Sequence, residues 1–236
     1  FDGAVHAPDF LFLWNLIDRH QITTFGTSPK FLQACINSGI KLEPRHFRQL
    51  RAILSTGAPL LPEHYDWVGA ETEQKVRLSS ISGGTDLISC FALGHPDLVV
   101  RRGEIQCLGL GMAVEAWNDL SEQVHDLKGD LVCTKPFVSM PLGFWGDGDG
   151  VKYKEAYFDK YAPLDIWAHG DYVQITENKG VVIYGRSDST LNPGGIRMGT
   201  AELYRVAEQR KDISDSLAIS QQWQGEERVI LFIKCL

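Results

Sequence analysis

The sequence has few cysteines, and none of them are closely spaced. Its five cysteines are scattered along the chain: Cys35, Cys90, Cys107, Cys133 and Cys235. Their number is odd and no two form a C-x-x-C motif, so neither a disulfide framework nor a zinc site of the usual spacing is indicated. Unpaired cysteines are typical of a reducing compartment, and we therefore expect a cytoplasmic protein.

Basic clusters and long apolar runs are also missing. The 236 residues include 23 Lys and Arg against 30 Asp and Glu, which gives a formal net charge of −7. A protein that binds a nucleic acid backbone needs a basic patch, so we expect no nucleic acid partner. No apolar run approaches the roughly 18–20 residues that span a bilayer, and no basic-then-apolar leader opens the chain. We therefore expect no membrane partner.

Two common catalytic motifs are absent as well. The G-x-S-x-G motif of serine hydrolases does not occur. A dinucleotide-binding dehydrogenase would have G-x-G-x-x-G at the start of a helix. The segment Gly109-Leu-Gly111 lacks the third glycine, and no helical pattern follows it. Neither enzyme class fits the chain.

The first part of the chain has the pattern of an α/β fold. Apolar residues recur at helical spacing through 10–38, interrupted by a β-like run at 22–25, which predicts helix, strand, helix. Ser28-Pro29 supplies an N-cap and a proline for the first turn of the second helix, and Gly39 is suited to end it. A further strand is predicted at 52–55. Alternating helices and strands favour a parallel sheet.

The pattern changes after about residue 96 to short β-like runs separated by Gly, Asp and Asn. These runs lie at 103–107, 113–117, 129–134, 172–175 and 181–184. A small β-barrel or sandwich subdomain is expected there, and we predict the barrel. The fold class is therefore α/β, with three parts in order: a parallel-sheet α/β subdomain at 1–95, the β-barrel subdomain at 96–186, and the start of a small α+β C-terminal domain at 187–236. The chain opens on Phe1 rather than Met and closes on a β-like run, so both ends look cut.

Three polar segments are candidates for a functional site, and the first is S-S-I-S-G-G-T-D at 79–86. Glycines let backbone N–H groups approach an anion. A hydroxyl such as that of Thr85 can donate to a phosphate oxygen, and a carboxylate such as that of Asp86 can hold Mg²⁺. A polar turn that caps a following helix is the alternative explanation of the same residues.

The second segment is H-G-D-Y at 169–172, in which a carboxylate follows a glycine just before a predicted strand. The Asp171 carboxylate can accept hydrogen bonds from both hydroxyls of a ribose, although a turn aspartate is the alternative explanation. His169 is adjacent, and we expect it to orient this loop rather than to catalyse. The other histidines show no metal-ligand spacing and are expected in solvent: His6, His20, His46, His64, His95 and His125.

The third segment, at 185–202, carries the most specific pattern. It resembles the hinge motif of the adenylate-forming superfamily of acyl-CoA ligases, which runs G-R-x-D, a turn, G-x-R and then E. The matching residues are Gly185, Arg186, Asp188, Gly195, Arg197 and Glu202. Six residues in register are difficult to explain as an exposed hairpin. Once this motif is admitted, the other two segments follow the order of the superfamily, and the segment at 55–60 precedes them as its adenine-side loop.

The resemblance implies a set of site residues. Those implied to bind the nucleotide are Gly57, Ala58, Pro59, Ser82, Gly83, Gly84, Thr85, Asp171, Arg186, Asp188 and Arg197. Within this set, Gly57 to Pro59 would line the adenine, Thr85 would contact the α-phosphate, and Asp171 with Arg186 would hold the ribose hydroxyls. The implied catalytic residues are Thr85, Asp86 and Arg197: Asp86 would support the metal ion, and Arg197 would approach the phosphate or the incoming CoA. Asp188 would serve as the hinge.

The flanks of these motifs resemble acetoacetyl-CoA synthetases in particular, for example G-M-A-V-E-A-W at 111–117 and W-A-H-G-D at 167–171. This resemblance implies an ATP-dependent acid–thiol ligase that joins acetoacetate to coenzyme A through acetoacetyl-adenylate, with ATP/AMP, Mg²⁺ and CoA bound. In related acetyl-CoA synthetases a Trp stands where we align Gly83. An indole occupies about 150–250 Å² of contact surface, so glycine there would open the acyl pocket.

Two alternatives remain open. Another short- or medium-chain acyl-CoA synthetase would share every nucleotide residue named above and differ only in its acid. A noncatalytic nucleotide-binding module is the other, because a glycine-rich phosphate loop and the catalytic lysine of the superfamily are not found in these 236 residues. Lys234 lies in an apolar run and does not match that lysine. We therefore expect this chain alone to be inactive; its oligomeric state is not indicated.

Overall fold

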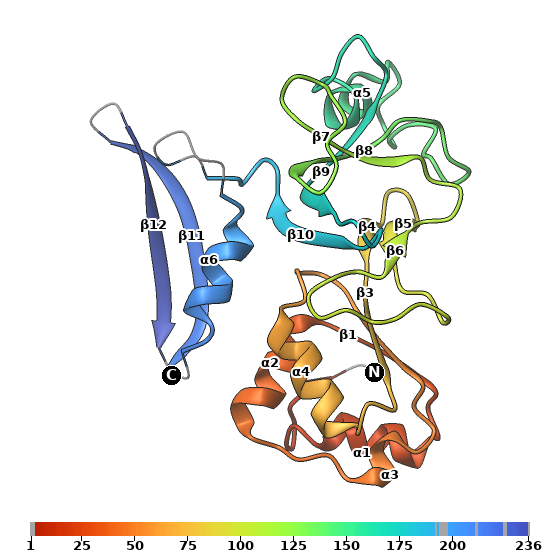
Figure 1. Cartoon of the computed structure of the whole chain (residues 1–236), viewed down its shortest axis with the longest axis vertical. Coiled ribbons are helices and arrows are strands. Elements are labelled where there is room, and N and C mark those ends of the chain that lie inside the picture. Colours follow the sequence, from red (N-terminus) through yellow and green to blue (C-terminus); the bar gives the residue numbers. More distant parts are fainter. Residues whose placement is uncertain (1–2, 192, 194–197, 211, 224–225, 236) are drawn as a thin grey trace. The chain divides into compact units, whose positions relative to one another are not determined.

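The computed structural model describes residues 3–191, 193, 198–210, 212–223 and 226–235 (Figure 1). The chain divides into two compact units. The first comprises Phe1–Ser82 with Leu93–Gln106, and the second comprises Gly83–Ala92 with Cys107–Leu236. A short excursion of the chain, from Gly83 to Ala92, therefore belongs to the second unit although the residues on both sides belong to the first.

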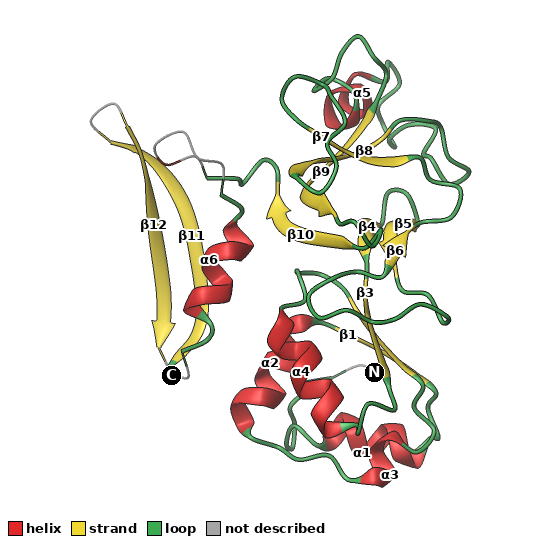
Figure 2. Ribbon diagram, viewed as in Figure 1, coloured by secondary structure: helices red, strands yellow, loops and turns green. Residues whose placement is uncertain are grey.

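The first unit is an α/β layer with a parallel sheet, as the sequence predicted. Its strands are β1 (Thr24–Thr27), β2 (Ala52–Ser55) and β3 (Arg77–Ser80), in the order β1-β2-β3. Its helices are α1 (Phe12–Arg19), α2 (Pro29–Ser38), α3 (Pro44–Phe47) and α4 (Pro62–Glu71), shown in red beside the sheet in Figure 2. The strand expected at 22–25 begins two residues later.

The ends of α2 follow the predicted local chemistry. The Ser28 hydroxyl accepts a hydrogen bond from the backbone N–H of Phe31 (3.4 Å), and Pro29 occupies the first turn. Gly39 ends the helix with φ of 67°, a left-handed conformation that glycine adopts without strain. The helix packs into a core centred on Trp14, whose ring is fully buried and lies 6.3 Å from the ring of Phe31.

The second unit begins with two small sheets. The first contains β4 (Ser82–Gly84), β5 (Ser89–Leu93) and β6 (Cys107–Leu108). The second is antiparallel and contains β7 (Val114–Trp117), β8 (Lys128–Cys133), β9 (Trp167–Ile175) and β10 (Val181–Arg186), in the order β10-β9-β8-β7. Helix α5 (Val151–Tyr157) lies in the connection between β8 and β9.

The predicted β-barrel is wrong. Within the described residues, β7 and β10 each pair with one neighbour and form the two edges of an open sheet. Four strands are too few to curl back on themselves, since small barrels have about five to eight strands. The runs at 103–107 and 113–117 had suggested more strands for one barrel, but β6 joins the other small sheet instead.

The remaining elements of the second unit are α6 (Thr200–Ala207), β11 (Ile213–Trp223) and β12 (Glu226–Cys235). The two strands form an antiparallel ribbon, and α6 packs against β11 (Figure 1). Lys128 on β8 donates to the carboxylate of Glu202 on α6 (2.7 Å), which connects this helix to the four-stranded sheet. No helix in the described part of the chain is both long and apolar enough to cross a membrane.

Two histidines expected in solvent are instead buried. His46 and His64 are 0% and 2% exposed, and each is the third residue of a helix that begins with proline. The Nδ1 atom of His64 accepts from the backbone N–H of Leu61 (3.0 Å), so the imidazole caps α4. The expectation was wrong because the pattern Pro-x-His at a helix start was not recognised as a cap.

Candidate functional site

An acidic and a basic side chain from two of the predicted motifs meet on neighbouring strands. Asp171 on β9 is directly opposite Arg186 on β10 in the antiparallel register, and residues directly opposite one another project to the same face. The Nη1 atom of Arg186 lies 3.4 Å from Oδ1 of Asp171. A β-bulge between Ile183 and Gly185 produces this register, because it shifts the pairing just before Arg186.

Gly170 makes room for the Arg186 side chain. A Cβ atom at Gly170 would lie 2.3 Å from Nη2 of Arg186, and the φ of Gly170 is 85°, which L-residues with side chains rarely adopt. The guanidinium also donates from Nη1 to the carbonyl oxygen of His169 (3.0 Å). Each residue of His169-Gly170-Asp171 thus has a part in placing Arg186. His169 provides a carbonyl acceptor, Gly170 leaves space for the guanidinium, and Asp171 provides a carboxylate.

Asp188 extends this arrangement. The Nε atom of Arg186 lies 3.5 Å from Oδ1 of Asp188, and the backbone N–H of Ser187 donates to the carbonyl of Gly170 (2.7 Å). The guanidinium is therefore placed between the carboxylates of Asp171 and Asp188. The Asp171 side chain is 15% exposed and the Asp188 side chain is 73% exposed, so Asp188 faces solvent at the end of the pair.

Residues 83–86, which we call the phosphate-side loop, form the second part of the site. Ser82 is buried, whereas Gly84, Thr85 and Asp86 are exposed. A Cβ atom at Gly83 would lie 2.2 Å from the carbonyl oxygen of Ser89 on β5. Glycine is therefore required at 83 for the close approach of two backbone segments. The sequence interpretation explained Gly83 by an open acyl pocket and did not foresee this close backbone approach. The acyl-pocket role stays a prediction.

Asp86 is held by a residue that the sequence interpretation missed. The hydroxyl of Tyr157, at the end of α5, donates to Oδ2 of Asp86. The Tyr157 ring stacks on Trp167, with ring centroids 3.7 Å apart and planes at 12°. Burial, followed by the hydrogen bond to Asp86, raises the pKa of Tyr157 above its ordinary value, so the phenol stays a proton donor. No sequence signal connects Tyr157 with Asp86, because the two residues are 71 positions apart.

His169 lies between the two parts of the site. A Cβ atom at Gly84 would be 3.6 Å from its Cε1 atom, and its Nε2 atom is 4.0 Å from Oδ2 of Asp171. Burial lowers the pKa of His169, the charges of Asp171 and Asp86 oppose that effect, and the charge of Arg186 adds to it. The phosphate-side loop, Asp171 and Arg186 thus surround one buried imidazole.

The predicted adenine-side residues belong to the first unit. Gly57, Ala58 and Pro59 follow the carboxyl end of β2, which is the edge of a parallel sheet where ligands bind in open α/β folds. Gly57 has φ of 95°, and a Cβ atom there would meet no neighbouring atom within 4 Å. Gly57 and Ala58 are exposed, and their use as an adenine wall stays a prediction.

The expected metal and phosphate contacts have different outcomes. No group of three or more His, Cys, Asp or Glu side chains in the described ranges could hold a metal ion. Mg²⁺ often uses only one or two carboxylates together with substrate phosphates, and the exposed carboxylate of Asp86 fits that limited role. The predicted Arg197 lies outside the described residues, as does Gly195 of the same motif.

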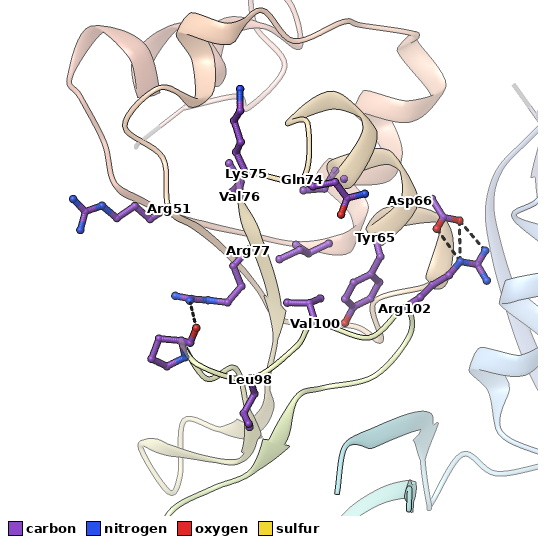
Figure 3. Close-up of a pocket in the computed structure, with 14 residues that line it drawn as sticks. Arg51, Tyr65, Asp66, Gln74, Lys75, Val76, Arg77, Leu98, Val100 and Arg102 are labelled. Atoms are coloured by element: carbon purple, nitrogen blue, oxygen red, sulfur yellow. Dashed lines mark hydrogen bonds and ion pairs between the residues drawn. The ribbon is translucent and has the colours of Figure 1, made fainter. Parts of the chain in front are cut away.

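A cavity of about 480 Å³ lies elsewhere in the first unit, at the amino ends of β2 and β3 (Figure 3). It contains none of the predicted site residues. Arg102 is paired with Asp66 (2.8 Å), and Arg77 donates to a backbone carbonyl (3.2 Å). In Figure 3 the charged ends of Arg51 and Lys75 point away from the centre. The cavity therefore lacks converging polar groups, and we assign it no ligand.

The chain resembles known proteins over almost its whole length, although no protein-family model matches it. It is 46% identical over 235 residues to the acetoacetyl-coenzyme A synthetase of Rhizobium meliloti (strain 1021), a match that covers 99% of this chain and 36% of that protein. It is 47% identical over 237 residues to the acetoacetyl-CoA synthetase of Gallus gallus, covering 99% and 35%. The chain thus spans about a third of the length of these relatives.

Many solved structures resemble this one, including the following two. The acetoacetyl-CoA synthetase from Streptomyces lividans matches with a TM-score of 0.87 and 36% identity, over 100% of this chain and 36% of that chain. The anthranilate CoA ligase AuaEII, in complex with anthranoyl-AMP, matches with a TM-score of 0.78 over 99% of this chain and 42% of that chain. Its identity is 19%, so this second likeness supports the fold alone.

Proposed function

This chain is a homologue of the acetoacetyl-CoA synthetases, and from that premise we propose that it supplies nucleotide-binding residues to a ligase that converts acetoacetate, ATP and CoA into acetoacetyl-CoA, AMP and pyrophosphate. The observation that supports this most directly is the arrangement around His169. Two motifs about 85 residues apart in the chain meet there, and each has the chemistry for a different part of a nucleotide.

The ribose end of the proposed site uses Asp171 and Arg186, which we call the ribose pair. A carboxylate accepts hydrogen bonds from both hydroxyls of a ribose, and Arg186 holds that carboxylate in place (3.4 Å). Charge-assisted hydrogen bonds of this kind contribute about 1.5–3 kcal/mol each. Loss of either partner should therefore weaken nucleotide binding by about tenfold or more.

The phosphate end uses the phosphate-side loop. The acid carboxylate attacks the α-phosphorus of ATP and pyrophosphate leaves, which gives an acyl-adenylate; the thiol of CoA then displaces AMP. We propose that Thr85 donates to the α-phosphate and that Arg197 offsets its developing negative charge. Asp86, oriented by Tyr157, would hold Mg²⁺, which neutralises phosphate charge when it is bound.

Asp188 is proposed as the hinge about which the C-terminal part of the chain rotates between the two reaction steps. Its side chain is 73% exposed, and it lies two residues after β10, in the segment that leads to α6. A hinge needs a few residues at the end of an element that can change their φ and ψ angles. Rotation there would exchange the residues that face the nucleotide without disturbing the ribose pair.

We also propose a cytoplasmic location. The five cysteines form no disulfide within the described part of the chain, which supports a reducing compartment. Acetoacetate is the acid proposed on the basis of the named relatives, and another short- or medium-chain acid is the alternative.

A chimeric enzyme tests the proposed reaction. This chain would replace the matching 235 residues of the Rhizobium meliloti protein, and AMP release would be measured with acetoacetate, propionate or hexanoate beside the 236-residue chain alone. We expect acetoacetate to be used at least tenfold better than the other acids, and the chain alone to be inactive. Preference for propionate or hexanoate would identify a different ligase. Adenylate formation by the chain alone would show that these residues suffice.

A further inference from the structure

The side chain of His169 is nearly buried beside the proposed nucleotide site. Its side chain is 9% exposed, and its imidazole contacts the ring of Phe91 edge-on, with centroids 4.8 Å apart. The Cε1 atom of the ring would lie 3.6 Å from a Cβ atom at Gly84. The imidazole is therefore enclosed between β5 and the phosphate-side loop.

The polar atoms of His169 have unequal surroundings. Nε2 lies 4.0 Å from Oδ2 of Asp171, and the ring also hydrogen-bonds to the backbone of Gly83. Nδ1 is fully buried and has no hydrogen-bond partner among the residues that the structure describes. A second proton on Nδ1 would place an unsatisfied donor in an apolar site. The neutral ring with its proton on Nε2 is the form that fits.

The backbone of His169 serves the other half of the site. Its carbonyl oxygen accepts from Nη1 of Arg186 (3.0 Å). His169 therefore contacts both parts of the site. Its ring contacts the phosphate-side loop and faces the carboxylate of Asp171, and its carbonyl accepts from Arg186. Because Nδ1 is buried and Nε2 faces protein groups, the ring is not placed to exchange protons with a substrate.

We propose that His169 is a positioning residue that fixes the spacing between the phosphate-side loop and the ribose pair. The inference rests on the proposed function, because it assumes that one nucleotide bridges these two parts. AMP occupies both parts, whereas adenosine lacks the phosphate and occupies only the ribose end. The affinity that the phosphate adds should therefore depend on His169, and the affinity for adenosine should not.

Three variants separate the role of the ring from its volume. His169→Gln places an amide N–H near the position of Nε2, His169→Asn places one near Nδ1, and His169→Phe keeps the volume without a donor. By calorimetric titration we expect His169→Asn and His169→Phe to bind AMP about tenfold more weakly and adenosine within about twofold of the parent chain. His169→Gln should keep most of the AMP affinity. Equal losses for AMP and adenosine, or equal behaviour of the Gln and Asn variants, would overturn the proposal.

A second measurement needs no nucleotide. Amide NMR resonances of Gly83, Gly84 and Asp171 would be compared between the parent chain and the same variants. We expect His169→Asn and His169→Phe to shift resonances on both sides, and His169→Gln to restore them. Shifts limited to the neighbours of 169 on β9 would refute the role of His169. If the parent chain bound neither AMP nor adenosine, a preformed nucleotide site in this chain would be contradicted; the chimera would still test the proposed function, and the NMR comparison would still decide the structural part.

Discussion

Arg186 lies across the bare backbone of Gly170, and this contact illustrates how one missing side chain can determine a site. The distance from a Cβ atom at 170 to Nη2 of Arg186 would be 2.3 Å, far below van der Waals contact. A carboxylate next to a glycine in a loop is common, and turn chemistry explains it without any ligand. The position of the arginine provides the additional reason for glycine here.

The first prediction concerns this contact. Gly170→Ala should displace the guanidinium of Arg186 and strain a backbone with φ of 85°, and the left-handed backbone alone should cost about 1–2 kcal/mol of stability. AMP affinity should fall about tenfold through loss of the ribose pair geometry. Gly146→Ala is the matched control, because its φ is also left-handed (75°) and nothing lies within 4 Å of its Cβ position. Urea unfolding and AMP titration measure the two effects; similar values for both variants would refute the contact.

Tyr157 is the second residue-scale case. Its hydroxyl orients Asp86 while its ring stacks on Trp167, so the two functions of the side chain can be separated. Since its pKa is raised, the phenol remains a donor through neutral pH. Nothing in the sequence connects positions 157 and 86, which are 71 residues apart.

Tyr157→Phe should keep the stack and lose the hydrogen bond. We expect Mg²⁺ to enhance ATP binding several-fold less in this variant, because the Asp86 carboxylate is no longer oriented, while ATP binding without Mg²⁺ is unchanged. Tyr153→Phe is the control, since the Tyr153 hydroxyl donates to the carbonyl of Pro141 (2.7 Å) rather than to Asp86. An unchanged Mg²⁺ effect in Tyr157→Phe would show that the hydrogen bond does not matter for the metal.

At the scale of elements, α3 and α4 begin in the same unusual way. Each has proline at its start and histidine two residues later, and the histidine Nδ1 accepts from the backbone N–H that precedes the helix: Glu43 for His46 (3.0 Å) and Leu61 for His64 (3.0 Å). The second nitrogen of His64 pairs with Gln33 on α2 (3.0 Å), so the cap also connects two helices. A protonated ring would lose the acceptor at Nδ1.

The cap makes stability depend on pH. Burial lowers the pKa of His64 to about 4, against an ordinary value of 6.5. Between these values the unfolded chain binds more protons than the folded chain, so the free energy of unfolding should rise with pH in this window, by up to about 1.4 kcal/mol per pH unit. His64→Ala should lower stability at pH 7 by about 1–3 kcal/mol and reduce this slope. Denaturant unfolding at several pH values, with exposed His125→Ala as control, measures both; a slope equal to that of the parent chain would contradict the cap.

Sequence reasoning succeeded for elements with local signals and failed for those set by distant contacts. Ser28-Pro29 and Gly39 mark the ends of α2 correctly, because capping involves residues only three or four positions apart. The predicted barrel was wrong because the sequence of a single strand does not determine which strand it pairs with. The run that contains β6 has the same β-like pattern as the runs after it, but β6 pairs in another sheet. Asp171 and Arg186 were predicted as site residues from sequence motifs. Their position opposite each other depends on the β-bulge between Ile183 and Gly185, which the sequence did not indicate.

At the scale of the whole molecule, the chain spans about a third of the length of the proteins it resembles. Within it, the second unit brings together Gly84, Asp86, Asp171 and Arg186 around one buried histidine, although these residues come from three separate segments. The adenine-side residues belong to the first unit. The central claim is therefore that the second unit contains a ribose-phosphate site that is already formed without a ligand.

Calorimetric titration of AMP into this chain and into Asp171→Ala tests that claim most directly. Asp171→Ala removes the carboxylate proposed for the ribose hydroxyls and leaves Arg186 with Asp188 (3.5 Å). We predict saturable binding to the parent chain and a loss of about tenfold or more in the variant. Equal affinity in the two chains, or binding to neither, would contradict a preformed nucleotide site in these residues.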